Sequence, residues 1–325
     1  YKHAVSQGNK SFVPDFKNIF ENQESIDIVG ENFKIEFSKI EGVISSWTLG
    51  NKDYIIDGPK PNFWRPPTDN DFGNNMPVRL YAWKEASENW VVRDVHVLKK
   101  DNFIGINIKV YYPNLEIEGE IAYGIGGDGI ILVTNSIDLE KSKLPNLPKF
   151  GMSMALPKRF DNFTWFGRGP HESYIDRKSS AKIDLHTGKV SDQYHPYIRP
   201  QENGNKTDVR WATFRDQYGY GLMLSGYLSL KASHYTVDDY DTGVLIEDSG
   251  ALKLHKKNRH TIDMVERNLV QLDIDHLQMG VGGEDSWGSQ PMEEYQLKPK
   301  KYIYHFSMQL IEPSDEPRNI YKNSF

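Results

Sequence analysis

Apolar and polar residues alternate along most of this sequence, and turn residues interrupt the alternation about every 8–12 positions. Residues 26–56 read as three or four short strands with breaks at Gly30, Gly42 and Gly50. The further segments with this pattern are 90–100, 103–113, 115–125, 129–139, 219–235, 269–281 and 300–311. The glycine-rich break at 124–129 predicts a hairpin. A chain with this period folds into antiparallel sheets that are covered on at least one face.

So many short strands predict an all-β fold, a large antiparallel sandwich or barrel. Helical periodicity is scarce, and 77–86 and 234–244 are the best candidates for short helices. No Pro/Ser-rich linker divides residues 27–312, which therefore form one large domain in this interpretation. Residues 1–26 read as a linker or the tail of a preceding domain, and 313–325 as a polar tail. Since the chain starts with Tyr1, we expect a piece of a longer polypeptide.

Composition narrows the function classes. The net charge is −6 and the pI about 6.0, which argues against nucleic acid and an anionic membrane as partners. The absence of cysteine excludes disulfides, zinc–thiolate sites and a cysteine nucleophile, and leaves a cytoplasmic or periplasmic location equally open. The aromatic content of 12% fits either packing in large sheets or stacking on sugars, and composition does not choose between them.

Four polar, glycine-rich and aromatic loops interrupt the strands, and loops of this kind on a rigid sheet often carry sites. They span residues 63–77, 165–178, 194–211 and 280–288. In the first, Asp69, Asn70 and Asp71 follow two prolines. Such residues usually cap helices or form Asx turns, and their spacing is not that of a calcium-binding EF-hand loop, so we predict no metal here.

In the second loop, Gly167 and Gly169 flank Arg168, which predicts a sharp turn that displays the arginine. His171 and Glu172 are adjacent, so on an extended chain they face opposite ways. We favour structural roles for both, with the acid paired to an arginine, over a role in proton transfer.

The third loop holds the polar and aromatic residues that line carbohydrate clefts, unless it merely covers a sheet edge. These residues are Tyr194, Tyr197, Arg199, Gln201, Glu202 and Asn203. In the fourth loop, Glu284 and Asp285 are neighbours, whereas glycoside hydrolysis needs two carboxyls about 5–10 Å apart across the bond. We therefore expect these acids to cap backbone N–H groups, which leaves Trp287 on display. Among recognised motifs, the chain contains neither G-x-S-x-G nor H-E-x-x-H, and its glycine-rich 124–129 opens no helix, so it does not read as a phosphate loop.

The four motifs FWRPPTDNDFG, GRGPHESYIDR, YIRPQENG and MGVGGEDSWG, in this order, resemble the C-terminal domain of family 2 glycoside hydrolases with β-galactosidase activity. The resemblance covers residues 27–312 and implies a galactose-mutarotase-like supersandwich. It implies that Trp287 stacks on a galactoside, with Glu284 and Asp285 in the same loop. It also places Asn70, Asp71 and Gly73 near the mouth of the active site.

The same resemblance implies that the catalytic glutamates, and the magnesium and sodium ions, belong to a separate (β/α)₈ barrel, so this chain is expected to hold neither a catalytic pair nor a cofactor. Two alternatives remain. The first is a stand-alone enzyme like an aldose epimerase, with His171 and either Glu172 or Glu202 as acid and base. The second is a carbohydrate-binding module without catalysis. Secondary candidates for substrate contact are Arg168, His171, Glu172, Glu202 and Asn203.

Overall fold

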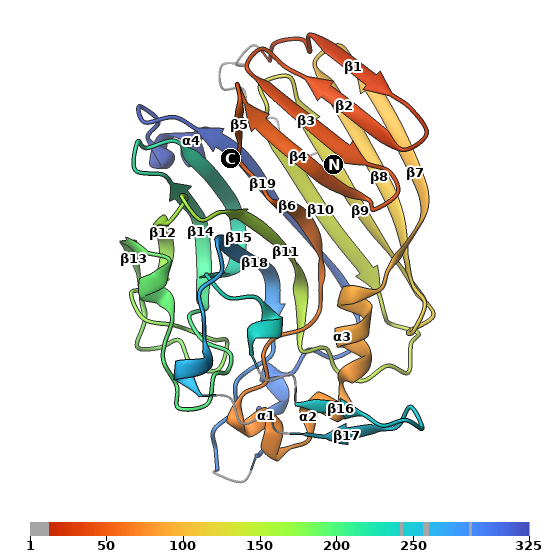
Figure 1. Cartoon of the computed structure of the whole chain (residues 1–325), viewed down its shortest axis with the longest axis vertical. Coiled ribbons are helices and arrows are strands. Elements are labelled where there is room, and N and C mark those ends of the chain that lie inside the picture. Colours follow the sequence, from red (N-terminus) through yellow and green to blue (C-terminus); the bar gives the residue numbers. More distant parts are fainter. Residues whose placement is uncertain (1–12, 241–242, 256–259, 286–287, 325) are drawn as a thin grey trace.

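The computed structural model describes residues 13–240, 243–255, 260–285 and 288–324. A small antiparallel sheet comes first in the chain, and its strands follow one another in sequence order. It consists of β1 (Asn18–Glu21), β2 (Ser25–Val29), β3 (Phe33–Ser38), β4 (Val43–Leu49) and β5 (Lys52–Asp53). In Figure 1 this sheet covers one face of the second, larger sheet at the upper right.

The larger sheet has 12 strands, and every pairing in it is antiparallel. Its strands are β6 (Asp57–Asn62), β7 (Val91–Lys100), β8 (Phe103–Tyr112), β9 (Ile117–Gly126), β10 (Ile131–Asp138), β11 (Lys149–Pro157), β12 (Asn162–Gly169), β13 (Lys182–Lys189), β14 (Lys206–Arg215), β15 (Gly221–Ser233), β18 (Leu269–Gln278) and β19 (Lys301–Ile311). One path runs β13-β12-β14-β15-β19-β10-β9-β8-β7, and a branch from β15 runs through β18 and β11 to β6. In Figure 1 this sheet is strongly curved, so that it has one concave and one convex face.

The remaining elements are short. They are β16 (Val244–Ile246), β17 (Leu252–Leu254), α1 (Asp69–Gly73), α2 (Met76–Arg79), α3 (Tyr81–Glu88), α4 (Pro317–Ser324) and four 3₁₀ turns, Ser191–Gln193, Val237–Asp239, Thr261–Asp263 and Glu293–Tyr295. Helices α1 and α2 and the β16–β17 hairpin lie together at the lower end of the molecule (Figure 1). No helix in the described ranges has both the length and the apolar character needed to cross a bilayer.

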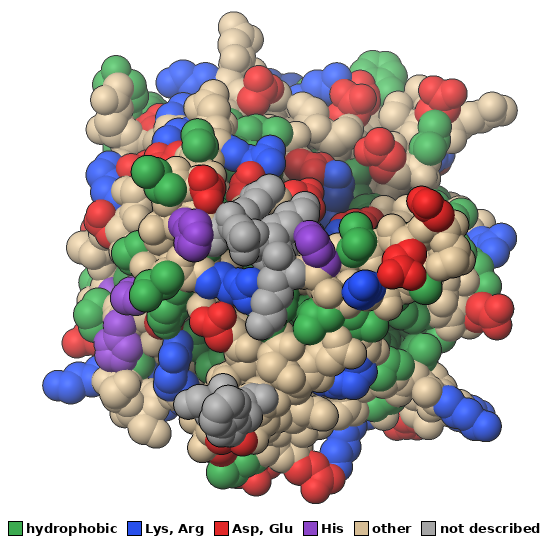
Figure 2. Space-filling model, turned by 60° about the horizontal axis from the view of Figure 1, so that its bottom comes forward, with side chains coloured by type: hydrophobic (Ala, Val, Ile, Leu, Met, Phe, Trp, Pro, Cys, Tyr) green, Lys and Arg blue, Asp and Glu red, His purple; other side chains and the backbone are tan. Residues whose placement is uncertain are grey.

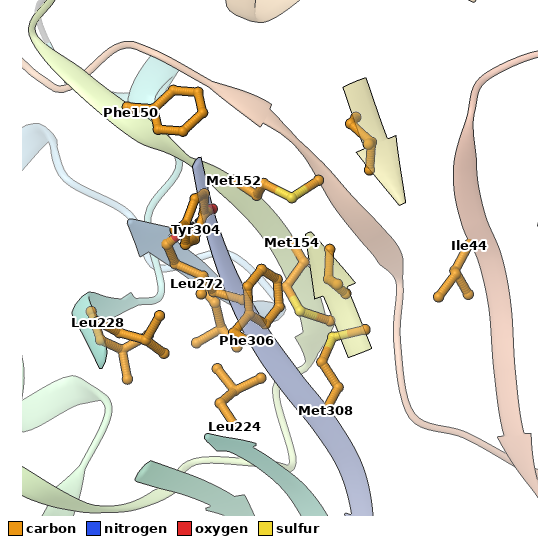
Figure 3. Close-up of a cluster of buried hydrophobic side chains, with 14 of the residues drawn as sticks. Ile44, Phe150, Met152, Met154, Leu224, Leu228, Leu272, Tyr304, Phe306 and Met308 are labelled. Atoms are coloured by element: carbon orange, nitrogen blue, oxygen red, sulfur yellow. Dashed lines mark hydrogen bonds between the residues drawn. The ribbon is translucent and has the colours of Figure 1, made fainter. Parts of the chain in front are cut away.

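One continuous hydrophobic core joins the two sheets. Phe37 of the small sheet packs edge-on against Tyr123 of the large one, with ring centroids 5.6 Å apart. The core continues along the branch of the large sheet, where Met152, Leu272 and Phe306 are buried together (Figure 3). The predicted all-β class and the large antiparallel sandwich are therefore confirmed.

Some strands of the large sheet are covered on one face and others on both faces. Burial alternates strictly along β10, so one face meets the core and the other is more open to solvent. Strands β11 and β15, by contrast, are buried at almost every position, and β18 has no exposed position, being buried at half of its residues and half-buried at the others. Their second face is also covered, and it carries charged and polar side chains. This covered polar face adjoins the site described below.

Most predicted strands are confirmed, including the β7–β10 meander and the hairpin at Gly126–Gly129, where the amide of Gly129 donates to the carbonyl of Gly126 at 2.9 Å. The predicted helix over 77–86 is also confirmed, with a break at Leu80 between α2 and α3. The predicted helix over 234–244 is wrong. Thr236 and Asp239 cap a single 3₁₀ turn, and the backbone is extended again at Tyr240.

The first and last described segments, 13–26 and 313–324, take part in regular structure. Strand β1 pairs with β2, and the amide of Phe16 donates to the carbonyl of Asp101 at 2.9 Å, so the predicted boundary at residue 26 falls inside β2. The predicted polar tail contains helix α4, and Ile320 and Tyr321 on it pack against a small buried cluster around Trp211.

Candidate functional site

The four loops singled out from the sequence meet at one end of the molecule. The segment 63–77 touches 278–283 through Arg65 and Asn70. It touches the 194–211 segment through Asp69, whose amide donates to Gln201 Oε1 at 3.0 Å. These contacts join parts of the chain that are more than 130 residues apart. Figure 2 brings this end forward and shows acidic, basic and hydrophobic side chains interspersed on its surface.

Two further hydrogen bonds connect the 165–178 segment to the other loops. The amide of Gly282 donates to Asp176 Oδ2 at 2.9 Å, which ties the 165–178 segment to 280–288. The amide of Ser173 donates to the carbonyl of Asn205 at 2.8 Å, which ties it to 194–211. Each loop is therefore hydrogen-bonded to at least one of the others. Two strands reach into them, because Trp165–Gly169 belongs to β12 and Lys206–Trp211 to β14.

A buried ion pair organises the first loop. The guanidinium of Arg65 lies 3.0 Å from Asp71 Oδ2, and both side chains are excluded from solvent. The same guanidinium donates to the carbonyls of Met279 at 2.7 Å and Gly280 at 3.0 Å, and to Gln278 Oε1 at 3.2 Å. Arg65 therefore holds the base of the 280–288 loop against the 63–77 segment.

Asp71 also builds helix α1. Its backbone amide donates to Thr68 Oγ1 at 3.1 Å, and its carboxylate accepts from the amide of Thr68 at 2.9 Å, which forms a capping box. Asp71 thus takes helix capping, one of the two roles that are usual for such residues. Its carboxylate lies in the interior, so it acts on a ligand only by shaping the loop.

The 280–288 loop is held on both sides of residues 286–287. Asp285 accepts from the amide of Ser289 at 3.1 Å and from its hydroxyl at 2.7 Å, so this acid caps the loop as expected. Gly288 has φ +89°, and a Cβ there would lie 2.4 Å from the Cα of Gly73. Only glycine permits this approach of the two backbones. Glu284 is exposed beside Asp285, and Trp287 lies outside the described residues.

The pair His171 and Glu172 does not converge. His171 is exposed and its Nε2 lies 3.1 Å from Ser180 Oγ. Glu172 points the other way, where it accepts from the hydroxyl of Tyr197 at 2.5 Å and the amide of Gly204 at 2.8 Å, and pairs with Arg177. The carboxylate thus joins two loops, in agreement with the structural role favoured from the sequence.

Arg168 is used within the structure rather than displayed, which corrects the expectation for it. Its Nε lies 2.5 Å from Asp208 Oδ2, and its Nη1 donates to the carbonyls of Lys178 at 3.0 Å and Ala181 at 2.8 Å. The predicted sharp turn is also wrong, because Gly167 and Gly169 lie within β12, paired with Asp184 and Lys182 of β13. The guanidinium folds back to brace the 165–178 loop. Burial would raise the pKa of the Asp208 carboxyl, but hydrogen bonds from Arg168 and Tyr227 and the charge of Lys178 bring that pKa below its usual value.

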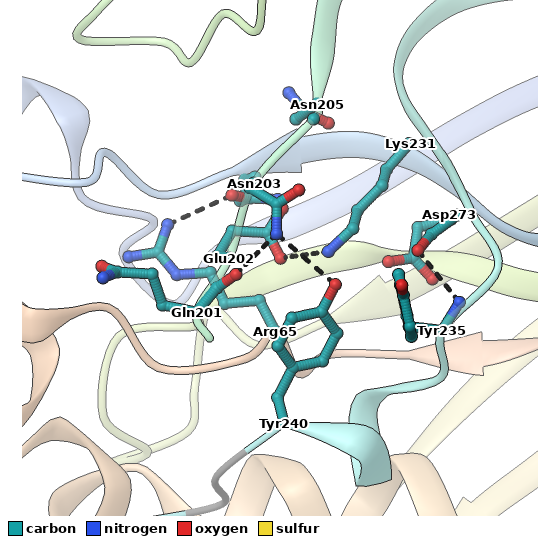
Figure 4. Close-up of polar contacts among 12 residues, drawn as sticks. Arg65, Gln201, Glu202, Asn203, Asn205, Lys231, Tyr235, Tyr240 and Asp273 are labelled. Atoms are coloured by element: carbon teal, nitrogen blue, oxygen red, sulfur yellow. Dashed lines mark hydrogen bonds and ion pairs between the residues drawn. The ribbon is translucent and has the colours of Figure 1, made fainter. Parts of the chain in front are cut away.

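Glu202 and Asn203 are buried behind the loop surface. Glu202 Oε2 lies 2.8 Å from Lys231 Nζ. Asn203 accepts from the amide of His195 at 3.0 Å and donates to the carbonyl of Gln201 at 2.8 Å (Figure 4). Both residues shape the 194–205 segment from inside.

Sequence reasoning missed the charged groups on the covered face of β11, β15 and β18. Lys149 Nζ lies 3.1 Å from Asp273 Oδ2 and 3.3 Å from Asp275 Oδ2, and Lys149 and Asp275 are fully buried. Burial raises the pKa of Asp275 to about 8, despite the nearby Lys149. For Lys149, burial alone would lower the pKa, but Asp273 and Asp275 raise it. The sequence signal was the spacing of two acids in β18, opposite Lys231 of β15.

Over the ranges that the structure describes, no three His, Asp or Glu side chains are grouped so as to hold a metal ion. The described groups offer hydrogen bonds and shape, but no facing pair of free carboxyls and no histidine paired with a carboxylate on the loop surface. The chemical role that these groups allow is to position a ligand beside the 280–288 loop.

The chain is similar in sequence to known proteins over most of its length. A family model described as the β-galactosidase small chain matches residues 29–310. A β-galactosidase from Priestia megaterium (strain DSM 319 / IMG 1521) is 33% identical over 282 residues, which are 85% of this chain and 25% of that protein. A β-galactosidase from Streptococcus thermophilus is 30% identical over 297 residues, 91% of this chain and 28% of that protein. The chain thus spans about a quarter of the length of these relatives.

Among solved structures, a galactose 1-epimerase from Lactobacillus acidophilus NCFM aligns with 92% of this chain and 98% of its own, at 8% identity and a TM-score of 0.47.

Proposed function

Because this chain belongs to the β-galactosidase small-chain family, we propose that it is one domain of a larger β-galactosidase and completes an active site whose catalytic groups lie on another domain. The reaction would be hydrolysis of terminal β-D-galactosides with retention of configuration. Such an enzyme uses two carboxyls about 5–5.5 Å apart, one as acid/base and one as nucleophile. We assign both to the separate (β/α)₈ barrel, together with the magnesium and sodium ions.

One observation carries this proposal. Four loops that are distant in sequence are locked into one surface, and the 280–288 loop is mounted on it by Arg65, Asp285 and the contact between Gly73 and Gly288. Positioning of this kind contributes to catalysis when it holds a substrate in a fixed geometry. In the proposal Trp287 supplies a ring face for the sugar, and Asn70, Glu284 and Asp285 border it.

The geometry of the described side chains does not favour the stand-alone epimerase. That reaction needs an acid and a base that face one ligand. His171 contacts Ser180, Glu172 binds Tyr197 and Gly204, and Glu202 is buried against Lys231. None of these three faces another across a shared cavity.

The test is complementation. We would assay a chromogenic β-galactoside with this chain alone, with the matching barrel-containing polypeptide alone, and with both together. The proposal expects activity only in the mixture. Activity of this chain alone would refute it, because a catalytic pair would then reside here.

A matched set of variants tests the role of the loop. Trp287→Ala is expected to raise KM in the mixture about five-fold with a smaller change in kcat, since a lost stacking contact is worth about 1 kcal/mol, and Trp287→Phe should keep most of the affinity. Unchanged kinetics in Trp287→Ala would remove Trp287 from the site.

A further inference from the structure

The covered face of the large sheet carries a second cluster of polar groups, which adjoins the loops from the inside, since Lys231 pairs with Glu202. Strands β6, β11, β18 and β15 lie side by side there. Ser153 pairs with Asp273, and Asp273 pairs with Lys231, so these side chains form one row on one face of the sheet. The opposite face of the same strands holds Leu272 and Met152 in the hydrophobic core. A polar row on a covered face is unusual, because burying such groups costs free energy unless they are paired.

A cavity of about 160 Å³ lies over this row. Its floor includes Ser153, Asp273 and Gln271. Glu88 at the end of α3, which is exposed, and Val237 of the 3₁₀ turn also line it. The volume is smaller than the roughly 300–1,000 Å³ of pockets that enclose drug-sized ligands, so the cavity suits a ligand of about one sugar ring.

The charges in the wall compensate one another. Lys231 pairs with Glu202 at 2.8 Å, Asp273 with Lys149 at 3.1 Å, and Lys84 with Glu88. No single sign of charge dominates, so the cavity favours a neutral ligand over an anion or a cation. Both donors and acceptors are fixed in the wall, since Asn62 Nδ2 also donates to Asp273 Oδ1 at 3.3 Å.

Aromatic residues form another part of the wall. Trp64, Tyr235 and Tyr240 line the cavity and are buried. Trp64 Nε1 is buried and has no hydrogen-bond partner among the described residues. Buried indole N–H groups usually have a partner. Figure 4 shows Tyr240 and Tyr235 beside Lys231 and Asp273. Rings next to fixed donors and acceptors suit a ligand that has both C–H faces and hydroxyl groups.

We propose that this cavity is a second carbohydrate site, which binds one neutral sugar unit on this chain alone. The site lies over the face of β6, β11, β18 and β15, and is independent of the barrel and of the proposed catalytic role. For a ligand of about a dozen non-hydrogen atoms, the expected Kd is on the order of 1 mM.

The test is a saturation-transfer NMR titration of the 325-residue chain with D-galactose, D-glucuronate and inorganic phosphate. Two variants address the cavity. Gln271→Ala removes a lining amide whose hydrogen bond, to the carbonyl of Leu272, is long at 3.5 Å, and Ser153→Leu fills the floor. Gln309→Ala on β19 is the matched control, because this glutamine is also half-buried in a strand but lies outside the cavity.

We expect saturable binding of galactose, weakened about ten-fold in Gln271→Ala, abolished in Ser153→Leu and unchanged in Gln309→Ala. Melting temperatures of all variants verify that they fold. Absence of saturable galactose binding, or binding that persists in both cavity variants, overturns the proposal. Tighter binding of glucuronate or phosphate overturns the assignment of a neutral ligand. Loss of binding in Trp287→Ala, with none in Gln271→Ala or Ser153→Leu, would place the sugar on the loop surface and refute the second site.

Discussion

Removing the carboxylate of Asp71 is expected to destabilise the loop end much more than removing that of its neighbour Asp69. Asp71 is buried against Arg65 and caps helix α1, whereas the Asp69 side chain is 67% exposed on the same helix. In Asp71→Ala the guanidinium of Arg65 stays in the interior without its counter-charge.

The structure sets the size of the effect. Removing one partner of a buried pair costs about 3–5 kcal/mol. Arg65 keeps acceptors on Gln278, Met279 and Gly280, so we take the lower end, about 3 kcal/mol. Loss of the cap adds about 1 kcal/mol, which gives about 4 kcal/mol in total. At about 2 °C per kcal/mol for a chain of this size, Tm should fall by about 8 °C.

Thermal unfolding of the 325-residue chain, followed by circular dichroism, measures this difference. Asp69→Ala is the control, because its exposed side chain loses only a pair at 3.8 Å to Arg199 and a hydrogen bond at 2.9 Å from Gln201 Nε2. Each contributes no more than about 1 kcal/mol, which gives a fall in Tm of at most about 4 °C. Equal shifts in the two variants would refute the argument that the Arg65–Asp71 pair holds the loop end together.

Three further predictions concern the loops and the covered face. Gly288→Ala should raise KM in the complemented enzyme several-fold, because φ is +89° there and the new Cβ would meet Gly73. The control Gly250→Ala, at φ +80° with open space around it, should leave the kinetics unchanged. Equal kinetics in both variants would show that the Gly73–Gly288 contact is dispensable. Burial raises the folded-state pKa of Asp275 to about 8, so the folded chain binds more protons than the unfolded one from about pH 4 upward, and this contribution to stability is lost as pH rises toward 8. Urea unfolding at about pH 5 and about pH 8 should show that Asp275→Asn reduces this decline, and an unaltered slope would contradict the assignment. His171→Ala should change kcat of the complemented enzyme less than about two-fold and leave its pH profile in place, since His171 contacts Ser180 at the surface; a 100-fold loss would revive a role in proton transfer.

Much of the fold follows from the sequence because β strands with one open face carry their own signal. In β8 and β10 the buried residues alternate with more exposed ones, and the period of two is visible in the letters. Helix α1 was not predicted, although Thr68 and Asp71 have the spacing of a capping box. The helix predicted at 234–244 failed because Asp239 caps a single turn instead of extending it.

The sequence motifs predicted which segments form the site, but not what each residue does in it. The resemblance of four loops indicated which segments meet, and the structure brings them together through Arg65, Gln201 and Asp176. Their individual roles did not follow, because exposure is a tertiary property. Arg168 was expected on display between two glycines, and instead it pairs with Asp208.

The charged face of β15 and β18 shows the limit most clearly. Asp273 and Lys231 occupy alternate positions in otherwise apolar strands, which is the pattern of a solvent-facing side. Only the return of the 194–205 segment and α3 over these strands makes that side an interior. A sequence read one strand at a time does not contain this information.

Charged pairs attach the motif-bearing loops to the sheet, together with apolar contacts of buried residues such as Phe63 and Trp64. Arg65 fixes 278–280, and Lys231 of β15 fixes Glu202 in the 194–205 segment at 2.8 Å. Well-packed apolar side chains of similar size would often be as stable or more so, so stability alone does not explain these pairs. An ion pair with its hydrogen bonds satisfied specifies one arrangement, whereas apolar surfaces tolerate small shifts in packing. For a domain that must present a loop to chemistry on another domain, a fixed arrangement matters more than the last increment of stability, since a misplacement of about 1 Å can cost 100-fold in rate.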